Sequence, residues 1–285
     1  RAGGVQATDD WQKVVRADNV DAVVIATTHD HLAPIALAAA RAGKHFLIEK
    51  PAARSVGELK PVMQAVQETG VIVKVGFNHR FHPAFIQARE IFGSGALGPM
   101  MFIRGRYGHG GRPGYEKEWR ADREISGGGE LVDQGMHLID LSRWFLGDFE
   151  RCDGFMPTYF WDMKVEDNAF MALQTEAGQM AWLHATWTEW KNMFSFEIYG
   201  KDAKLHIEGL GGSYGVEQLT YYKMLPEMGP PEISHWEYPL PDRSWDLEFQ
   251  EFEKAIHEKR QPSGNLEDAL AALEVLDHLY QQVKP

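Results

Sequence analysis

Two groups of residues in this sequence have the types and spacing needed for proton chemistry, and the first is Lys50. It follows a short apolar run, Phe46 to Ile48, of the kind that forms a buried strand in a parallel sheet. Pro51 ends that strand, because proline has no N–H to donate to the sheet. Glu49 and Lys50 therefore lie at the carboxyl end of a strand, where open α/β sheets bind ligands. Alternatively, Lys50 is a solvated surface charge, as most lysines are.

The second group is Asp133 and His137, four residues apart in a predicted helix over Glu130–Leu146. On a helix this spacing places both side chains on one face. The helix start favours an ionised Asp133 and a neutral His137, and a neutral imidazole can act as a base. Three glycines, residues 127–129, leave the first N–H groups of the helix open to another molecule. Two alternatives stay open: a structural histidine beside an aspartate, and two ligands of a zinc site.

The composition is that of an ordinary globular protein. The chain has 285 residues, of which 44% are hydrophobic and 25% charged, which is enough for a large core or two domains. A formal net charge of −12 argues against nucleic-acid binding, which needs clustered lysine and arginine. No apolar run approaches the roughly 18 residues that span a membrane, and no signal peptide is visible. With a single cysteine, Cys152, the chain is expected in the cytoplasm with a small-molecule ligand.

The first part of the chain alternates between strand and helix patterns. Strands are predicted at 21–27, 46–48 and 71–77, and helices at 10–16, 31–42 and 55–69. The strand over 21–27 is rich in β-branched residues and is expected to be buried. A strand–helix–strand alternation of this kind predicts a parallel sheet with right-handed crossovers. This α/β half is expected to end near residues 77–82.

The second part changes character. Residues 151–239 mostly alternate between apolar and polar positions, which predicts a large, mostly antiparallel sheet. The clearest strands there are 169–175, 180–187, 194–199 and 219–223; a further strand is predicted at 100–107, and helices at 82–92, 245–258 and 266–283. A glycine-rich segment, 209–215, precedes a strand-like stretch, so we interpret it as a connection in or near the substrate cleft and not as a phosphate loop. A ligand is expected between the two halves.

The chain resembles the Gfo/Idh/MocA family over nearly its whole length. The resemblance rests on Thr27, Ala42–His45, Glu49–Pro51, Gly76–Phe81, Trp119–Arg120 and the pattern Gly-Gly-Gly-x-Leu-x-Asp-x-Gly-x-His-x-Ile-Asp over 127–140. It implies a Rossmann-type α/β domain at residues 1–78, lacking its N-terminal portion, followed by an α+β domain at residues 79–285 with a large, mostly antiparallel sheet. The C-terminal helix is expected to pack back on the first domain.

The resemblance also implies roles for individual residues. Lys50 matches the catalytic lysine, which in many members precedes a cis proline. His137 matches the acid/base on the reacting hydroxyl, and Asp133 the aspartate that orients substrate and histidine. Residues matching cofactor- or substrate-contacting positions are Thr27, His29, His31, Glu49, Lys50, Asn78, Arg80, Trp119 and Arg120. The cofactor is NAD or NADP, and no metal is expected.

The implied activity is hydride transfer between a nicotinamide cofactor and a hydroxyl or keto carbon of a sugar or sugar derivative. Segments 211–215 and 224–231 resemble members that act on nucleotide sugars or on cell-surface sugar building blocks. The alternative is a catalytically silent sugar- or cofactor-binding regulatory protein on the same fold. The family's Gly-x-Gly-x-x-Gly loop is expected before Arg1, and His31 is displaced by one residue from the family's usual histidine. The open sheet implies a homodimer or homotetramer.

Overall fold

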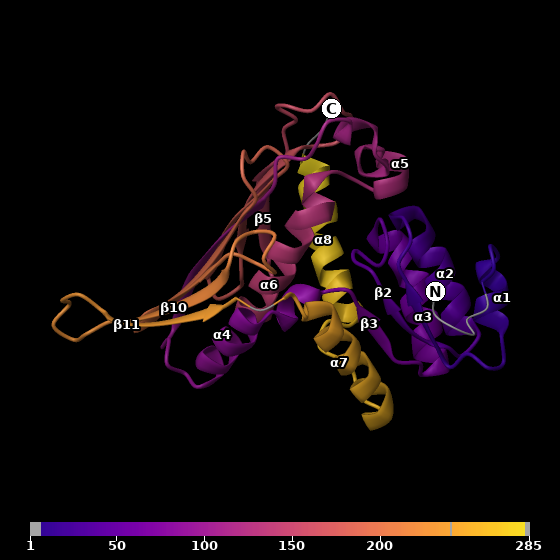
Figure 1. Ribbon diagram of the computed structural model, residues 1–285, viewed down its shortest axis with the longest axis horizontal. Coiled ribbons are helices and arrows are strands. Elements are labelled where there is room, and N and C mark those ends of the chain that lie inside the picture. Colours follow the sequence, from indigo (N-terminus) through magenta and orange to yellow (C-terminus); the bar gives the residue numbers. More distant parts are fainter. Residues whose placement is uncertain (1–6, 240, 283–285) are drawn as a thin grey trace.

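The computed structural model describes residues 7–239 and 241–282, and these residues form two sheets with helices around and between them (Figure 1). The smaller sheet is parallel and has the order β1-β2-β3. Its elements are α1 (Trp11–Arg16), β1 (Ala22–Ile25), α2 (His29–Arg41), β2 (His45–Ile48), α3 (Val56–Thr69) and β3 (Val73–Val75). The predicted alternation and parallel pairing are confirmed.

Helix α3 shows how local sequence sets the ends of an element. The hydroxyl of Ser55 accepts a hydrogen bond from the backbone N–H of Glu58, which satisfies one of the free donors of the first turn. At the other end Gly70 has a left-handed φ of 70°, a conformation that glycine adopts without steric cost. The helix therefore begins and ends where these two residues stand.

Strand β2 is buried on both faces and is the centre of the parallel sheet. Phe46 and Ile48 pack into the core shared with α2 and α3. Leu47 points to the opposite face, where Phe252 and Ala255 of α7 (Ser244–Glu258) cover it. The continuous apolar run of this strand is explained by these two coverings.

Strand β1 differs from the sequence prediction, which made it a buried strand. Val24 is 57% exposed, and only Ile25 in this strand is buried. Within the described residues, β1 pairs with β2 alone and lies at the edge of the sheet. Burial depends on neighbours in space, and β-branched residues indicate a strand without specifying how much of it is covered.

The larger sheet has eight strands in the order β11-β10-β9-β8-β4-β7-β6-β5. All neighbours pair antiparallel except β4 and β7, which are parallel. The strands are β4 (Met100–Gly108), β5 (Arg151–Phe155), β6 (Asn168–Gln174), β7 (Met180–Thr186), β8 (Met193–Gly200), β9 (Ala203–Glu208), β10 (Glu217–Lys223) and β11 (Glu232–Tyr238). The mostly antiparallel sheet is confirmed.

One face of the larger sheet is covered by helices and the other is open. Helices α4 (Pro83–Gly93), α6 (Met136–Leu146) and α8 (Leu266–Gln282) contact the covered face. On β7, Ala181, Leu183 and Ala185 point into that core, whereas Trp182 between them is exposed. This alternation is the period of two expected for a sheet with one buried face.

Helix α8 joins the two sheets (Figure 1). It contacts α6 and β5 of the large-sheet half and also α3 and β3 of the parallel half. The expected contact of the C-terminal helix with the first domain is therefore present, although Val283 of the predicted helix lies outside the described residues. None of the described helices is both long and apolar enough to cross a membrane.

Candidate active site

Lys50 lies directly beyond β2, and its side chain crosses to the other half of the molecule. Its ammonium donates to a carboxylate oxygen of Asp133 at 2.8 Å and to the backbone carbonyl of the same residue at 2.5 Å. The side chains of Lys50 and Asp133 are 13% and 16% exposed. The peptide bond between Lys50 and Pro51 is cis. This ion pair joins two residues that are 83 positions apart in the sequence.

Asp133 is held as a carboxylate by two cations. Burial would raise its pKa, but the charges of Lys50 and Arg120 outweigh burial and hold the pKa well below the ordinary value. Arg120 lies in η3 (Trp119–Ala121), with its Nε 3.3 Å from the second carboxylate oxygen. Asp133 therefore stays ionised and orients both cations.

His137 stands in the first turn of α6, immediately after the π-helical turn η4 (Leu131–Gly135) that carries Asp133. The predicted helix is thus interrupted, but both side chains still line one cavity. The imidazole is buried, and burial together with the charge of Lys50 lowers its pKa well below the ordinary value. The neutral form expected from the helix start is favoured here by burial and a neighbouring cation.

The three glycines before η4 do not leave free N–H groups for another molecule, and this expectation is wrong. The carboxylate of Glu166 accepts from the backbone N–H groups of Gly129 and Leu131, at 2.9 and 3.1 Å. The hydroxyl of Tyr280 donates to the same carboxylate at 2.7 Å. A Cβ at Gly128 would lie 2.0 Å from that hydroxyl, so the close approach that glycine permits is made by the protein's own α8.

A cavity of about 440 Å³ lies at the carboxyl ends of β1 and β2; we call it the sheet-edge cavity. Its walls are formed by Ala26, Thr27, Thr28, His29, Glu49, Lys50, Trp119, Arg120 and Asp133. The ring of His29 meets that of Trp119 edge to face, with centroids 4.8 Å apart. The guanidinium of Arg120 lies 4.5 Å from the Trp119 ring centre, a cation–π contact. The cavity therefore combines flat aromatic walls with polar groups.

Two titratable residues of the sheet-edge cavity are shifted toward their neutral forms. Burial and the nearby Lys50 lower the pKa of His29 to about 4. One of its ring nitrogens, Nδ1, lies 2.7 Å from the carbonyl oxygen of Ser126, so this nitrogen carries the proton and Nε2 is an acceptor. Burial raises the pKa of Glu49, although Lys50 opposes the shift. Both groups can exchange hydrogen bonds with a polar ligand.

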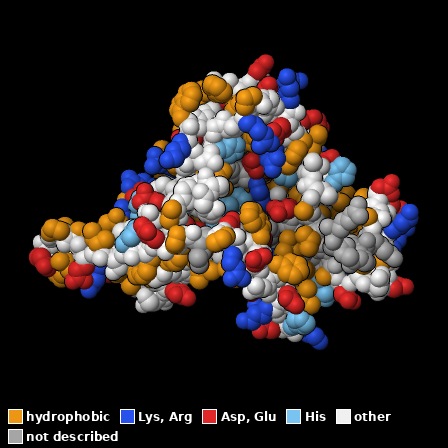
Figure 2. Space-filling view, viewed as in Figure 1, with side chains coloured by type: hydrophobic (Ala, Val, Ile, Leu, Met, Phe, Trp, Pro, Cys, Tyr) orange, Lys and Arg blue, Asp and Glu red, His pale blue; other side chains and the backbone are white. Residues whose placement is uncertain are grey.

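A second cavity of about 400 Å³ adjoins the first, and we call it the tyrosine cavity. It is lined by Lys50, Tyr107, His109, Arg112, Tyr115, Glu118, Arg120, Asp133, Gln134, His137 and Tyr214. Lys50, Arg120 and Asp133 belong to both cavities. In Figure 2 acidic, basic and histidine side chains lie close together between the two halves of the molecule.

Gln134 organises one wall of the tyrosine cavity. With the amide oriented to satisfy its neighbours, its nitrogen donates to the Glu130 carboxyl at 2.7 Å and to the Tyr107 carbonyl at 3.2 Å, and its oxygen accepts from the Tyr214 hydroxyl at 2.9 Å. Tyr214 comes from the glycine-rich connection, whose expected place in or near the cleft is thus observed. Gly211 and Gly212, with φ of 53° and 77°, allow the turn that brings the ring inward.

Three predicted site residues line neither cavity. His31 is on the exposed side of α2, where it pairs with Asp30 at 2.9 Å. Asn78 is buried, and its amide donates to the hydroxyl of Ser244 at 3.0 Å. Arg80 is 4% exposed, and carboxylates of the C-terminal half surround its guanidinium. His31 lines neither cavity because its position on α2 points its side chain toward solvent. Asn78 and Arg80 line neither cavity because other protein groups bind their side chains.

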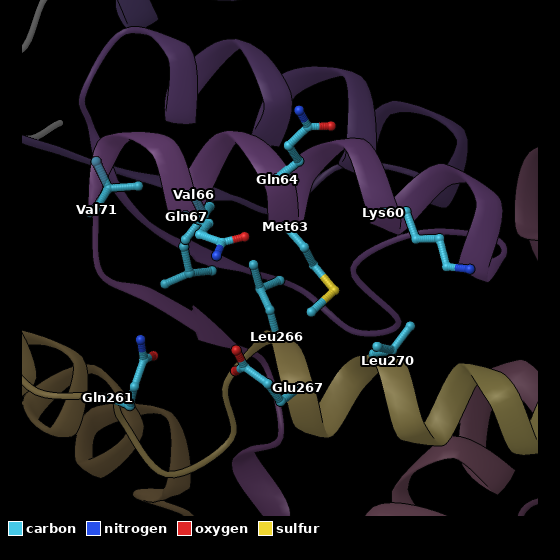
Figure 3. Close-up of a pocket in the computed structure, with 12 residues that line it drawn as sticks. Lys60, Met63, Gln64, Val66, Gln67, Val71, Gln261, Leu266, Glu267 and Leu270 are labelled. Carbon is cyan, nitrogen blue, oxygen red and sulfur yellow. The ribbon is translucent and has the colours of Figure 1, made fainter.

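A cavity larger than either of these lies away from Lys50, between α3 and the start of α8 (Figure 3). Its volume is about 680 Å³, and Met63 of α3 points across it toward Leu266 and Leu270 of α8. None of the predicted catalytic residues lines it, so volume alone does not identify the active site. Within residues 7–239 and 241–282, no group of three or more His, Cys, Asp or Glu side chains is arranged to hold a metal ion.

Sequence reasoning did not single out most of the tyrosine cavity. Tyr107, His109, Arg112, Tyr115, Glu118 and Gln134 were not predicted. Four of them lie in segment 109–124, whose glycine, proline and charge content indicates a loop but not the direction in which its side chains point. The signal for Tyr214 was the glycine-rich segment that carries it.

Comparison with known proteins identifies the family. Residues 1–77 match the model described as "Oxidoreductase family, NAD-binding Rossmann fold", and residues 85–206 match the Gfo/Idh/MocA C-terminal domain. Levoglucosan dehydrogenase of Pseudarthrobacter phenanthrenivorans is 33% identical over 62% of this chain, a match that spans 46% of that protein. The scyllo-inositol 2-dehydrogenase (NAD(+)) of Bacillus subtilis is 27% identical over 94% of this chain and 77% of its own.

Solved structures give the same result. A levoglucosan dehydrogenase in complex with NADH and levoglucosan superimposes with a TM-score of 0.86 at 25% identity, covering 96% of this chain and 81% of that one. An oxidoreductase domain protein from Kribbella flavida, also 25% identical, superimposes with a TM-score of 0.84 over 95% of this chain and 80% of that one. With both of its family models matched in order and a structural neighbour of the same kind, the chain belongs to the Gfo/Idh/MocA family of NAD-binding oxidoreductases.

Proposed function

We propose that this protein is an NAD-dependent dehydrogenase that oxidises a secondary alcohol of a sugar or cyclitol, or reduces the corresponding ketone. The observation that carries the proposal is the wall shared by the two cavities. Lys50, Arg120 and Asp133 face both spaces, so a ligand in one meets a ligand in the other at these groups. Such a meeting point is what a reaction between two bound molecules requires.

The sheet-edge cavity fits the nicotinamide end of the cofactor. It lies at the carboxyl ends of parallel strands, where doubly wound sheets bind dinucleotides. Thr27, His29 and Glu49 offer hydrogen-bonding groups for ribose and amide, and Trp119 offers a flat surface. Gly76 allows Glu49 to lie close to β3, since a Cβ there would be 3.0 Å from the Glu49 carboxylate. When bound, NAD supplies a hydride acceptor.

His137 is the group best suited to take the proton of the substrate hydroxyl. It lines the tyrosine cavity, and its lowered pKa keeps the imidazole neutral at neutral pH. Oxidation of an alcohol releases a hydride from carbon and a proton from oxygen, and a neutral imidazole accepts that proton. In the reverse direction the imidazolium returns it to the oxygen of the reduced ketone.

Lys50 stabilises the oxygen from which the proton leaves. Its ammonium is held by two oxygens of Asp133, so it is already oriented before the substrate binds. A preorganised cation acts on the negative charge that develops on the substrate oxygen, which costs no further reorganisation. Asp133 has the two functions of holding Lys50 and accepting hydrogen bonds from neighbouring hydroxyls.

The remaining wall groups indicate a substrate rich in hydroxyls. Tyr115, Tyr214 and Gln134 present polar atoms, and Tyr107 packs against Tyr214 with ring centroids 5.0 Å apart. Levoglucosan and inositol, the compounds in the names of two relatives, are rich in hydroxyls. A nucleotide sugar stays an untested prediction from the sequence.

The open face of the large sheet supports an oligomer, which we also propose. Trp182 is exposed on it, and Phe102 stacks on Tyr199 with ring centroids 4.2 Å apart. Aromatic side chains in such numbers on one face are typical of interfaces. Light scattering of the purified chain gives the mass directly, and a monomeric mass at micromolar concentration would contradict the proposal.

The activity is tested in two steps. NADH fluorescence is first titrated with the chain to measure cofactor binding. The chain is then incubated with NAD and levoglucosan, myo-inositol or scyllo-inositol, and reduction of the cofactor is followed at its near-ultraviolet absorbance band. We expect saturable binding and turnover of at least one polyol. Binding without turnover of any sugar or cyclitol, in either direction, would instead support the silent regulatory protein.

A further inference from the structure

The imidazole of His79 lies against that of His137. The two rings are stacked with centroids 3.8 Å apart and planes 19° from parallel. His79 belongs to η1 (Asn78–Phe81), the segment that links the two halves of the chain, and lines neither cavity. Both rings are buried. His79 therefore contacts the proposed base without being accessible to the substrate.

A chain of hydrogen bonds fixes the proton on His79. The amide nitrogen of Asn78 donates to the hydroxyl of Ser244, at the start of α7, at 3.0 Å. The amide oxygen of Asn78 is then left as an acceptor, and it lies 3.0 Å from Nδ1 of His79. Nδ1 must carry the proton in this arrangement, and Nε2 is unprotonated. The network thus holds His79 as a neutral ring of one tautomer.

The other neighbours of His79 leave its ring no alternative position. The ring of Tyr107 packs against it with centroids 5.3 Å apart, and that of His82 meets it edge to face at 5.6 Å. His82 is itself held by Glu217, 2.9 Å from its Nδ1. Close packing of this kind restricts a buried ring to a single rotamer.

We propose that His79 is a positioning residue: its neutral ring fixes the plane of the His137 imidazole and lets that imidazole accept the substrate proton. This inference rests on the proposed function of His137. The Nδ1 atom of His137 is buried, with no hydrogen-bond partner in the described part of the chain. Because no hydrogen bond at Nδ1 orients the ring, contact with His79 is the interaction that sets its plane.

The charge state of His79 matters for the same reason. The titratable groups around His137 are Lys50 and Asp133 from the cavity, and His79, His82 and Tyr107 from the protein interior. One cation, Lys50, already opposes protonation of His137. A second cation stacked at 3.8 Å would oppose it further, so the neutral tautomer of His79 favours proton uptake.

The kinetic test compares two substitutions at one position. His79→Leu removes the stacked ring, and we expect kcat to fall about 10- to 100-fold, the effect of a misplaced catalytic group, with KM within about threefold and NADH affinity unchanged. His79→Phe keeps a ring in place and is expected to retain kcat within about threefold. The control is His184→Leu, since His184 is also stacked, on Phe170 at 4.1 Å, but lies in β7 away from both cavities.

Two kinetic results would overturn the proposal. One is a His79→Leu enzyme with the kcat of the His184→Leu control. The other is an equal loss of kcat in His79→Leu and His79→Phe, which would show that the stacked ring is not what matters. Equal losses of thermal stability in the His79 and His184 variants, without a difference in kcat, indicate only a structural role and count against it.

A measurement that does not need turnover separates this proposal from the proposed function. Nitrogen NMR of histidine-labelled protein reports which ring nitrogen carries the proton. We expect the Nδ1–H tautomer for His79, and displaced or broadened His137 signals in His79→Leu. An Nε2–H tautomer, or His137 signals unchanged by His79→Leu, would overturn the positioning role. If these results hold but no polyol is turned over, the failure belongs to the proposed function alone.

Discussion

Two ion pairs between segments far apart in the sequence, Lys50–Asp133 and Arg80–Asp140, differ in whether a ligand can reach them. Lys50 and Asp133 are 13% and 16% exposed and lie in the wall between two cavities. Arg80 and Asp140 are 4% and 1% exposed, and the guanidinium donates to both oxygens of Asp140, at 2.9 and 2.5 Å. A ligand in either cavity can therefore contact Lys50 and Asp133, whereas Arg80 and Asp140 are enclosed by the protein.

The surroundings of Arg80 explain why it is closed. Asp268 at the start of α8 provides a third carboxylate oxygen 3.1 Å from the guanidinium. Burial would lower the pKa of Arg80, but these two carboxylates outweigh it and raise the pKa. Bidentate pairing satisfies the planar donor group, so nothing remains for a cofactor to bind. A charged residue in a family motif can thus serve the fold instead of the ligand.

The largest expected effect on activity is that of Lys50→Met. Removing the cation that stabilises the substrate oxygen is expected to lower kcat by about 10³-fold, within the range for loss of such a group. The matched control is Lys44→Met, which removes the lysine at the opposite end of β2, where Lys44 donates to the Ala17 carbonyl at 2.9 Å. Steady-state kinetics on both variants provide the measurement. Equal kcat values would remove Lys50 from the chemistry.

The largest expected effect on stability is that of Arg80→Met. It leaves the Asp140 carboxylate buried without its cation, a change that costs about 3–5 kcal/mol of unfolding free energy. The kcat per folded molecule should be close to that of the parent. Urea unfolding measures the free energy, and NADH titration checks the site. Full stability combined with lost NADH binding would return Arg80 to the cofactor site.

The pH dependence of stability sharpens the comparison, because His29 lines the same cavity as Lys50 and Asp133. The folded-state pKa of His29 is about 4, below the unfolded value of about 6.5. The unfolded chain therefore binds an extra proton between these values, and the stability present above pH 6.5 is lost as the pH falls toward 4. The contribution is at most about 1.4 kcal/mol per pH unit.

The measurement is urea unfolding at pH 7 and pH 5. His29→Leu is expected to lose less stability over this interval than the parent chain. His79 and His137, whose pKa values burial also lowers, shift stability in the same direction and leave a residual dependence in the variant. Identical pH dependence in parent and variant would mean that His29 is not neutral in the folded protein.

The smallest effect is expected from Tyr214→Phe. The substitution removes the hydroxyl that donates to Gln134 but keeps the ring against Tyr107. If the hydroxyl also contacts the substrate, loss of that one hydrogen bond, about 1 kcal/mol, corresponds to a rise of about fivefold in KM, with NADH affinity unchanged. Steady-state kinetics with the best polyol of the panel measure it. A changed NADH affinity with unchanged KM would place Tyr214 beside the cofactor instead.

The sequence predicted the elements that are defined by local patterns. The run Phe46–Ile48 and the alternation in β6, β7 and β8 are local, and the structure contains them. Strand β11 was not singled out, because it is a mostly exposed edge strand with little apolar alternation. The exposure of β1 and the π turn at η4 were also not predicted. They depend on which element lies alongside, and a single chain segment does not contain that information.

The site was predictable to the extent that short motifs specify it. Lys50, Asp133 and His137 were singled out from their local context, and the structure brings them to one cavity. Arg80 was expected at the site only from the family resemblance, and it is buried among carboxylates. Lys50 and Arg80 differ in their partners, Asp133 and Asp140, which lie at least 60 positions away in the sequence. Only the three-dimensional structure shows that Lys50 lines a cavity and that Arg80 does not.

The most direct test of the account follows a deuterium atom. The polyol with the highest turnover in the panel is prepared with deuterium on its ring carbons and incubated with the chain and NAD. Mass spectrometry of the reduced cofactor then detects the label. If the two cavities hold cofactor and substrate against their shared wall, one deuterium is transferred directly and turnover is slower than with unlabelled polyol. Reduced cofactor without the label would contradict the account.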